Sequence, residues 1–229
     1  MEKNSIPTNK SRYYRYVKFG SMIQNRRREL GIKQKDMVDG IIMEHDMPHY
    51  ESGERRPSYE KAMHIVEKLG DDDDLLHIHY LEDSMQKAVY RRKELWRFII
   101  EKKYGPLAGM VNDLTKDPTY QEGINKQYLL MCQAALLMEE PLRHDEMLSL
   151  TQKGMQIFRK NFNEFIFEIL LLSKVEAMLI NFMAISYSHG QKLNESIDVY
   201  MRLKNCLFAT KNDKASNQQL IPVILSVMK

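Results

Sequence analysis

Glycine and proline are scarce in this chain of 229 residues, which contains 10 glycines and 7 prolines. Sandwiches and barrels of many short strands need frequent turn residues, so this scarcity favours helices. Cysteine is rarer still. The two cysteines, Cys132 and Cys206, allow at most one internal disulfide, which excludes a secreted disulfide scaffold and fits a reducing, cytoplasmic location.

Long apolar runs are also lacking. The most apolar region, 165–185, is interrupted by Glu168, Lys174 and Glu176, whereas a membrane helix needs about 20 apolar residues with few charges. The first twenty residues contain no apolar stretch of the signal-peptide type. There is no glycine-rich phosphate loop and no defensible Ser-His-Asp arrangement. We therefore expect a cytoplasmic protein with no membrane partner, no enzymatic activity, no cofactor and no metal.

Charge of one sign is missing over most of the chain but not at its start. The formal net charge is only +3, too small to name a partner. Residues 1–35 nevertheless contain ten basic and two acidic residues, whereas residues 71–229 contain 20 basic and 21 acidic ones. Such an asymmetry suggests a basic head that meets a polyanion and a body that is nearly neutral.

The clearest boundary along the chain is Gly70 followed by four aspartates. Adjacent aspartates repel one another and indicate a solvated linker; a divalent-cation site is the alternative, but these acids lack the alternating spacing of a calcium loop. The sequence thus divides into a basic N-terminal extension, a head, an acidic linker and a body, at 1–19, 20–70, 71–74 and 75–229.

Helical periodicity dominates on both sides of that linker, so we expect an all-α fold. In the head, one helix ends at Gly31, and short helices follow at 34–38, at 44–51 and after the capping residue Ser58. The body has longer helical patterns separated by short breaks, which favour antiparallel packing. These patterns span 75–103, 106–116, 119–138, 144–160, 164–189, 192–209 and 218 to the end.

The head carries the strongest signal, in the region 22–57. Arg27 lies seven residues before Gln34, the turn Arg28-x-Leu30-Gly31-Ile32 lies between them, Met37 and Val38 are apolar, and the region closes with Glu51-Ser-Gly-Glu-Arg-Arg-Pro-Ser58. It resembles the helix-turn-helix domain of the lambda/434-repressor type. That resemblance implies a structural ion pair between Arg27 and Glu51, and a turn at Gly53 with positive φ.

The same resemblance assigns residues to DNA. Gln34 would hold a phosphate at a helix start, and basic side chains would neutralise further phosphates. The N-terminal residues of the helix after the turn would meet base edges in the major groove. Phosphate contacts are expected from Lys33, Gln34, Lys35, Arg55 and Arg56, and base contacts from Glu44, His45 and His49.

The region departs from the family pattern in several ways. The span from Gln34 to Glu51 is one residue shorter than usual. Met43 occupies the usual place of a Ser or Thr helix cap, and Pro48 removes an amide unless it lies in the first helical turn. Glu44 and Asp46 bring negative charge close to DNA.

A shortened helix-turn-helix domain before a long helical body resembles the Rgg/MutR branch of peptide-pheromone-sensing bacterial regulators, although this chain is short for that branch. The resemblance implies a five-helix-type DNA-binding domain, a homodimer, and a tetratricopeptide-like antiparallel array that binds a short signalling peptide. The body itself matches that repeat only weakly, at Ala184, Tyr187, Gly190, Ser196 and Tyr200. An ordinary helical bundle is the alternative.

Polar residues on the otherwise apolar inner helices are the candidates for holding a peptide: Arg159, Asn181 and Tyr187. Asn181 could instead bond a neighbouring helix. An alternative function is a helix-turn-helix regulator whose body only dimerises or binds another ligand. His45 and His49 could suggest a zinc site because they lie four residues apart, but they fall within the DNA-binding region.

The end of the sequence is strongly apolar, with seven aliphatic side chains or methionines between Leu220 and Met228. A short helix there would expose an apolar face unless something covered it. Either residues 218–229 pack on a second copy of the chain, which predicts a homodimer, or the chain is a truncated form of a longer array.

Overall fold

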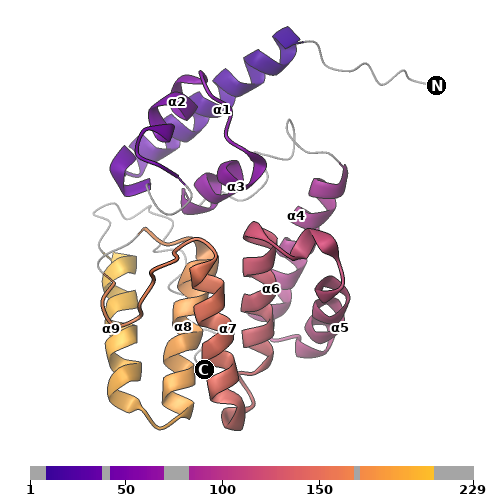
Figure 1. The fold of residues 1–229 in the computed structure, drawn as a ribbon, viewed down its shortest axis with the longest axis vertical. Coiled ribbons are helices and arrows are strands. Elements are labelled where there is room, and N and C mark those ends of the chain that lie inside the picture. Colours follow the sequence, from indigo (N-terminus) through magenta and orange to yellow (C-terminus); the bar gives the residue numbers. More distant parts are fainter. Residues whose placement is uncertain (1–8, 38–41, 70–82, 168–170, 209–229) are drawn as a thin grey trace, which may run out of the picture.

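The computed structural model describes residues 9–37, 42–69, 83–167 and 171–208 (Figure 1). All regular secondary structure in these ranges is helical, which confirms the predicted all-α class. Residues 71–74 of the linker and the apolar segment 218–229 lie outside the described residues. The α-helices are α1 (Asn9–Glu29), α2 (Asp46–Ser52), α3 (Tyr59–Lys68), α4 (Asp83–Ile100), α5 (Tyr104–Thr115), α6 (Gly123–Leu136), α7 (His144–Gln156), α8 (Lys174–His189) and α9 (Leu193–Phe208), and the 3-10 helices are η1 (Gln34–Met37), η3 (Pro118–Tyr120) and η4 (Pro141–Arg143).

Helices α1, η1, α2 and α3 form the head. Helix α1 begins at Asn9, within the predicted N-terminal extension 1–19, and it ends as expected before Gly31, whose φ is 67°. Ser58 caps α3 as expected, because its side chain accepts a hydrogen bond from the backbone N–H of Lys61. Buried aliphatic side chains and methionines from all four elements fill the space between them: Ile23, Met37, Met47, Met63 and Val66.

Helices α4 to α9 form the body. Figure 1 shows α6, α7, α8 and α9 side by side in a row, with α4 and α5 beyond α6. Neighbours in the row are neighbours in sequence, as expected for an antiparallel array, and α8 lies between α7 and α9. Helix α8 is buried along most of its length, which agrees with its apolar character on nearly every face.

One predicted helix of the body is wrong. The pattern at 164–189 predicted a continuous helix, but α8 begins only at Lys174. Ser173 and Glu176 form a capping box: the Ser173 side chain accepts from the Glu176 backbone N–H, and the Glu176 carboxylate accepts from that of Ser173. This box satisfies amides at the start of α8. Residues 157–167, between α7 and this capping box, are not helical. The apolar composition of the region alone did not indicate that the chain leaves the helical conformation there.

Other helix ends also differ from the sequence patterns. Helix α6 begins at Gly123, whose φ is 57°, and not at residue 119, because η3 occupies the positions just before it. Helices α4 and α7 stop at Ile100 and Gln156, a few residues before the ends predicted for them. The α8–α9 turn places its positive φ of 58° at Gln191 and not at Gly190.

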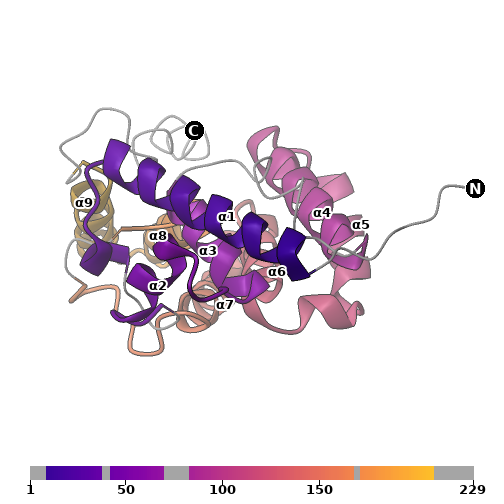
Figure 2. The same cartoon turned by 90° about the horizontal axis from the view of Figure 1, so that it is seen from above.

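Helix α3 connects the head to the body. The His64 ring lies 4.9 Å from the Phe158 ring, centroid to centroid, and α3 also packs against α6. Seen from above, α1 runs across the upper end of the body helices (Figure 2). Within the described residues, no helix is both long and apolar enough to cross a membrane.

Candidate functional site

The head is organised around the ion pair that its sequence predicted. Arg27 Nε lies 2.5 Å from Glu51 Oε1, and Arg27 Nη2 lies 2.9 Å from Glu51 Oε2. Arg27 Nη1 also donates to the Ile32 carbonyl at 2.7 Å. Both charged side chains are buried, at 8% and 4% exposure. The pair therefore joins α1, the turn after it and α2.

Two glutamines complete the surroundings of this carboxylate. Gln34 and Gln24 donate to Glu51 Oε2 at 2.9 and 3.1 Å. Burial would raise the pKa of Glu51, but the hydrogen bonds from Arg27, Gln34 and Gln24 outweigh it and hold the pKa below its usual value. One of the two Nε2 hydrogens of Gln34 is therefore used in the hydrogen bond to Glu51. The second Nε2 hydrogen is the one that could be donated to a phosphate.

Helix α2 separates an inner face from an outer one. Asp46, Met47, Tyr50 and Glu51 are buried. The outer side chains are exposed or half-exposed and follow the helical spacing i, i+3, i+4, i+7: His45, Pro48, His49 and Ser52. Two of the three predicted base-contacting residues, His45 and His49, thus share this face, and the third, Glu44, lies exposed just before the helix.

The unusual start of α2 is also resolved by the structure. Its N-cap is His45, which makes no side-chain cap bond, and not Met43 as the family pattern suggested. Met43 is 53% exposed instead. Pro48 is the third residue of the helix, so its missing amide falls in the first turn, where the helix makes no use of one.

Asp46 does not project a negative charge toward the outside, in contrast to the expectation from the sequence. It is 3% exposed, and its two carboxylate oxygens lie 2.8 Å from Lys61 Nζ and 3.3 Å from Arg55 Nη1. The hydrogen bond from Lys61 is the main reason that the pKa of Asp46 is lowered. Asp46 therefore ties α2 to α3. Sequence reasoning missed this role, although an acidic residue in the first turn of a helix is a recognisable signal.

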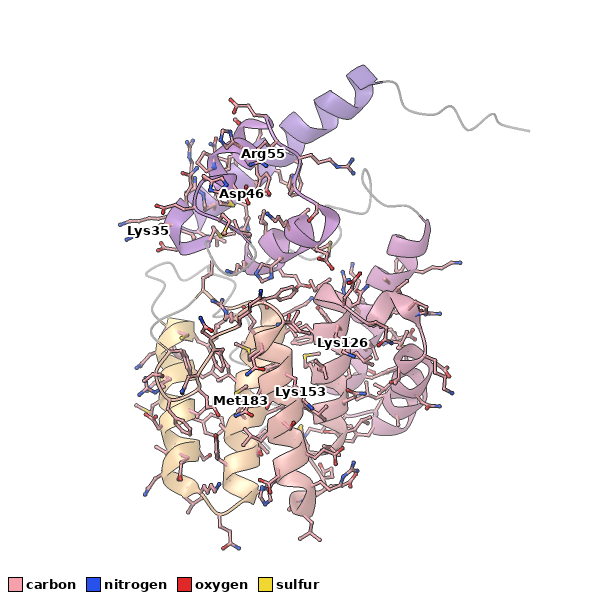
Figure 3. All side chains as sticks on the ribbon, in the orientation of Figure 1. Lys35, Asp46, Arg55, Lys126, Lys153 and Met183 are labelled. Carbon is pink, nitrogen blue, oxygen red and sulfur yellow. The ribbon has the colours of Figure 1, made fainter. Side chains whose placement is uncertain are left out.

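The predicted phosphate-contacting side chains lie in the segments that precede and follow α2 in the sequence. Lys33, Lys35, Arg55 and Arg56 are exposed. Figure 3 shows Lys35, Asp46 and Arg55 on the same side of the head. Arg55 keeps 58% of its side chain exposed while it contacts Asp46. Lys35 and Arg55 therefore lie on the side of the head where α2 begins.

The turn after α2 forms as predicted. Gly53 has φ 76° and its backbone N–H donates to the Tyr50 carbonyl. Beyond it, Glu54 Oε2 lies 2.8 Å from Nδ1 of His49, a contact that the sequence did not suggest. His45 has a weaker neighbour, since its Nε2 lies 3.7 Å from Asp46 Oδ1. Within the described residues, no three His, Cys, Asp or Glu side chains are grouped as metal ligands would be.

In the body, two of the three candidate peptide-binding residues already have internal partners. Arg159 Nε donates to Glu176 Oε1 at 2.6 Å. The Tyr187 hydroxyl donates to Glu164 Oε1 at 2.7 Å, and burial together with that carboxylate raises the pKa of Tyr187. Both partners fix the non-helical segment 157–167 and the start of α8 against the array.

Asn181 differs from these two residues. It lies in the middle of α8 and is fully buried, and among the residues that the structure describes neither its side-chain oxygen nor its nitrogen has a hydrogen-bond partner. A buried amide without partners is costly and needs an explanation. The alternative interpretation, that Asn181 bonds a neighbouring helix, has no hydrogen bond to support it within the part of the chain that is described.

Comparison with known proteins adds one structural likeness. No family model matches the chain, and no curated protein matches it. The chain is similar to a solved structure of Bacillus thuringiensis PlcR in complex with the peptide PapR7 and DNA. The two share 16% sequence identity, the match covers 93% of this chain and 72% of that one, and the TM-score is 0.44.

Proposed function

We propose that the chain is a sequence-specific, DNA-binding transcription regulator whose body takes a short signalling peptide. The observation that carries the DNA-binding part is the exposed outer face of α2, together with the exposed side chains of Lys33, Lys35, Arg55 and Arg56 in the segments before and after it. A short, firmly supported helix with basic flanks suits the major groove: its flanks bind phosphates and its face contacts base edges.

The rigidity of α2 supports this assignment. The Arg27–Glu51 pair holds its inner face, and Asp46 joins its first turn to α3. A recognition element must keep its side chains in place, because base discrimination depends on hydrogen-bond geometry. Glu44, His45 and His49 are the proposed base contacts, and Gln34 is a proposed phosphate contact through its second amide hydrogen.

The test is the salt dependence of binding to duplex DNA, measured with the full chain. Replacing both Arg55 and Arg56 with alanine should weaken binding about equally for all sequences. It should also reduce the slope of log affinity against log salt by about 1–2, because each phosphate contact releases counterions. A matched control is Arg97→Ala with Arg143→Ala, two exposed body arginines. If the variant with both Arg55 and Arg56 replaced showed the same salt dependence as wild type, these residues would not contact phosphates and the proposed orientation of the head on DNA would be wrong.

The peptide-binding part of the proposal is supported by Asn181. Its two unpaired polar atoms could hold the backbone of an extended peptide if the array opened enough to admit one. Arg159 and Tyr187 would take part by exchanging their internal carboxylate partners for the peptide. The alternative is that the body only dimerises or binds a different ligand, in which case Asn181 has a structural role alone.

Calorimetry with short synthetic peptides encoded beside the gene separates these alternatives. Asn181→Ala should remove most of the affinity for a peptide that binds wild type. The exposed Asn205 of α9 offers a matched control, since Asn205→Ala removes the same group from the surface. A folded Asn181→Ala variant with unchanged affinity would show that this residue makes no peptide contact.

We also propose that the regulator is a homodimer. The last described helix, α9, exposes apolar side chains along one side, at Leu193, Ile197, Met201 and Phe208. A second copy of the chain is the occupant we propose, because one head offers only a seven-residue helix and helix-turn-helix proteins commonly pair two half-sites. Sedimentation of wild type and Ile197→Asp tests this: dimer for the first and monomer for the second are expected, and a monomeric wild type would contradict it.

A further inference from the structure

The outer face of α2 carries one side chain whose orientation is set by a neighbour. Nδ1 of His49 lies 2.8 Å from Glu54 Oε2, while 46% of the His49 side chain and 66% of the Glu54 side chain remain exposed. The contact thus lies on the surface that we propose faces DNA. The other histidine of that face, His45, has only a 3.7 Å approach to Asp46.

The chain reverses direction in order to bring Glu54 back to His49. The positive φ of Gly53 turns the backbone after α2, and the backbone N–H of Arg55 donates to the His49 carbonyl at 3.1 Å. The Ser52 hydroxyl also donates to that carbonyl, at 3.2 Å, and accepts from the Glu54 backbone N–H at 3.4 Å. Backbone and side-chain contacts on both sides of Glu54 therefore hold it beside the imidazole.

A carboxylate at Nδ1 fixes the chemistry of the whole ring. A carboxylate only accepts hydrogen bonds, so the proton of a neutral imidazole must lie on Nδ1. Nε2 is then a hydrogen-bond acceptor, able to take a hydrogen from the amino group of adenine or cytosine in the major groove. Without the carboxylate, the ring could rotate or carry its proton on Nε2, and the preferred base would be lost.

We propose that Glu54 is a specificity-determining positioning residue, which accepts a hydrogen bond from Nδ1–H of His49 and so presents Nε2 to one base pair. This inference rests on the proposed DNA-binding function. It also gives a reason for an exposed carboxylate on a surface meant for phosphates, where an unengaged negative charge would only weaken binding. Glu54 acts through His49 and touches no base itself.

The experiment is selection of bound duplexes from a randomised DNA pool at low salt, using the full chain. Five proteins are compared: wild type, His49→Ala, Glu54→Ala, Glu54→Gln and Glu29→Ala. Glu29→Ala removes an equal charge from the exposed end of α1, outside the proposed DNA contacts and without touching the His49 contact. Glu54→Gln removes the charge but keeps an oxygen that can accept from Nδ1–H.

We expect Glu54→Ala and His49→Ala to lose sequence preference at the same base pair. Each should lose about tenfold discrimination at that single base pair, while Glu54→Gln and Glu29→Ala keep the wild-type preference there. Glu54→Ala and Glu29→Ala should both bind DNA of any sequence somewhat more tightly, because each removes one negative charge from the head. Nitrogen NMR of the imidazole at a pH where it is neutral should find the proton on Nδ1 in wild type, and a shift toward Nε2 in Glu54→Ala.

Three outcomes would overturn the inference. Glu54→Ala could keep the wild-type preference at every position, or it could lose preference at a base pair other than the one that depends on His49. The proton could also lie on Nε2 in the wild-type protein. A wild-type chain that binds no duplex at low salt would be different, because it would remove the proposed DNA-binding function and this inference together.

Discussion

In both the head and the body an arginine contacts a buried glutamate, but the two glutamates have different surroundings. In the head, Glu51 accepts from Arg27, Gln34 and Gln24, which are all residues of the head. In the body, Glu176 accepts from Arg159 and from the Ser173 backbone, and it also lies in the field of Lys68 and His64. Those last two residues belong to α3, a helix of the head.

This difference indicates where the two parts of the chain depend on one another. The Arg27–Glu51 pair joins elements of the head only. Glu176 caps the start of α8, holds the segment before it through Arg159, and has a pKa that is lowered in part by the charges of Lys68 and His64 on α3. The body carboxylate is therefore placed to couple the array to the DNA-binding part, whereas the head carboxylate is not.

The largest effect is expected from Glu176→Ala. It removes the capping box of α8 and the buried carboxylate that Arg159 contacts, so the free energy of unfolding should fall by about 3–5 kcal/mol. Hydrogen exchange should quicken in both α8 and α3. The exposed Glu139 of the body provides a control, because Glu139→Ala should have little effect. Unchanged protection of α3 in Glu176→Ala would remove the coupling role.

A somewhat smaller effect, about 3 kcal/mol, is expected from Arg27→Met, which leaves Glu51 buried without its arginine. The loss should be confined to the head. Hydrogen exchange should quicken in α1 and α2 while α8 and α9 stay protected. Equal acceleration in the body helices would contradict the distinction between the two carboxylates.

Acid should weaken both regions. Burial raises the pKa of Glu176, but the charges of Arg159, Lys68 and His64 outweigh it and lower the pKa from 4.5 to about 2. A carboxyl group whose pKa is depressed by folding stabilises the protein above its unfolded pKa. That contribution, about 3 kcal/mol, is lost as the pH falls from about 4.5 toward about 2. Chemical unfolding at several pH values across this range tests the prediction. The free energy of unfolding should fall less steeply with decreasing pH in Glu176→Gln than in wild type, and an identical pH dependence would refute it.

The smallest effect on stability is expected from Asp46→Ala. Its partners Lys61 and Arg55 are partly exposed, so the loss should be about 1 kcal/mol. Binding to duplex DNA should change more visibly than stability, because α2 loses its link to α3. Thermal unfolding and DNA titration of one preparation would reveal both effects. A loss of stability without any change in DNA binding would show that Asp46 does not position α2.

Much of the head was predictable because several of its residues have structural roles that depend on nearby positions in the sequence. The helix end at Gly31 and the serine cap at Ser58 can be recognised from the local sequence, whereas the Arg27–Glu51 pair and the turn at Gly53 were implied by the resemblance to helix-turn-helix domains. All five residues take the expected places. The contact between Glu54 and His49 was missed because it depends on how the chain folds back after Gly53.

The body was predictable only as a set of helices. Apolar periodicity cannot show where a chain leaves one helix and begins the next, so residues 164–173 were assigned to α8. One local signal was available: Ser173 and Glu176 have the S-x-x-E spacing of a capping box. The internal partners of Arg159 and Tyr187 were not available from sequence, because they depend on a non-helical segment that crosses the array.

The most direct test of the DNA-binding assignment is hydrogen exchange of the full chain with and without an excess of random-sequence duplex at low salt. We expect DNA to slow exchange at the backbone amides of residues 33–37 and 45–56, and to leave α5 and α9 unchanged. Slowing confined to the body helices, or no slowing anywhere, would contradict the assignment of α2 and its basic flanks as the DNA-binding surface.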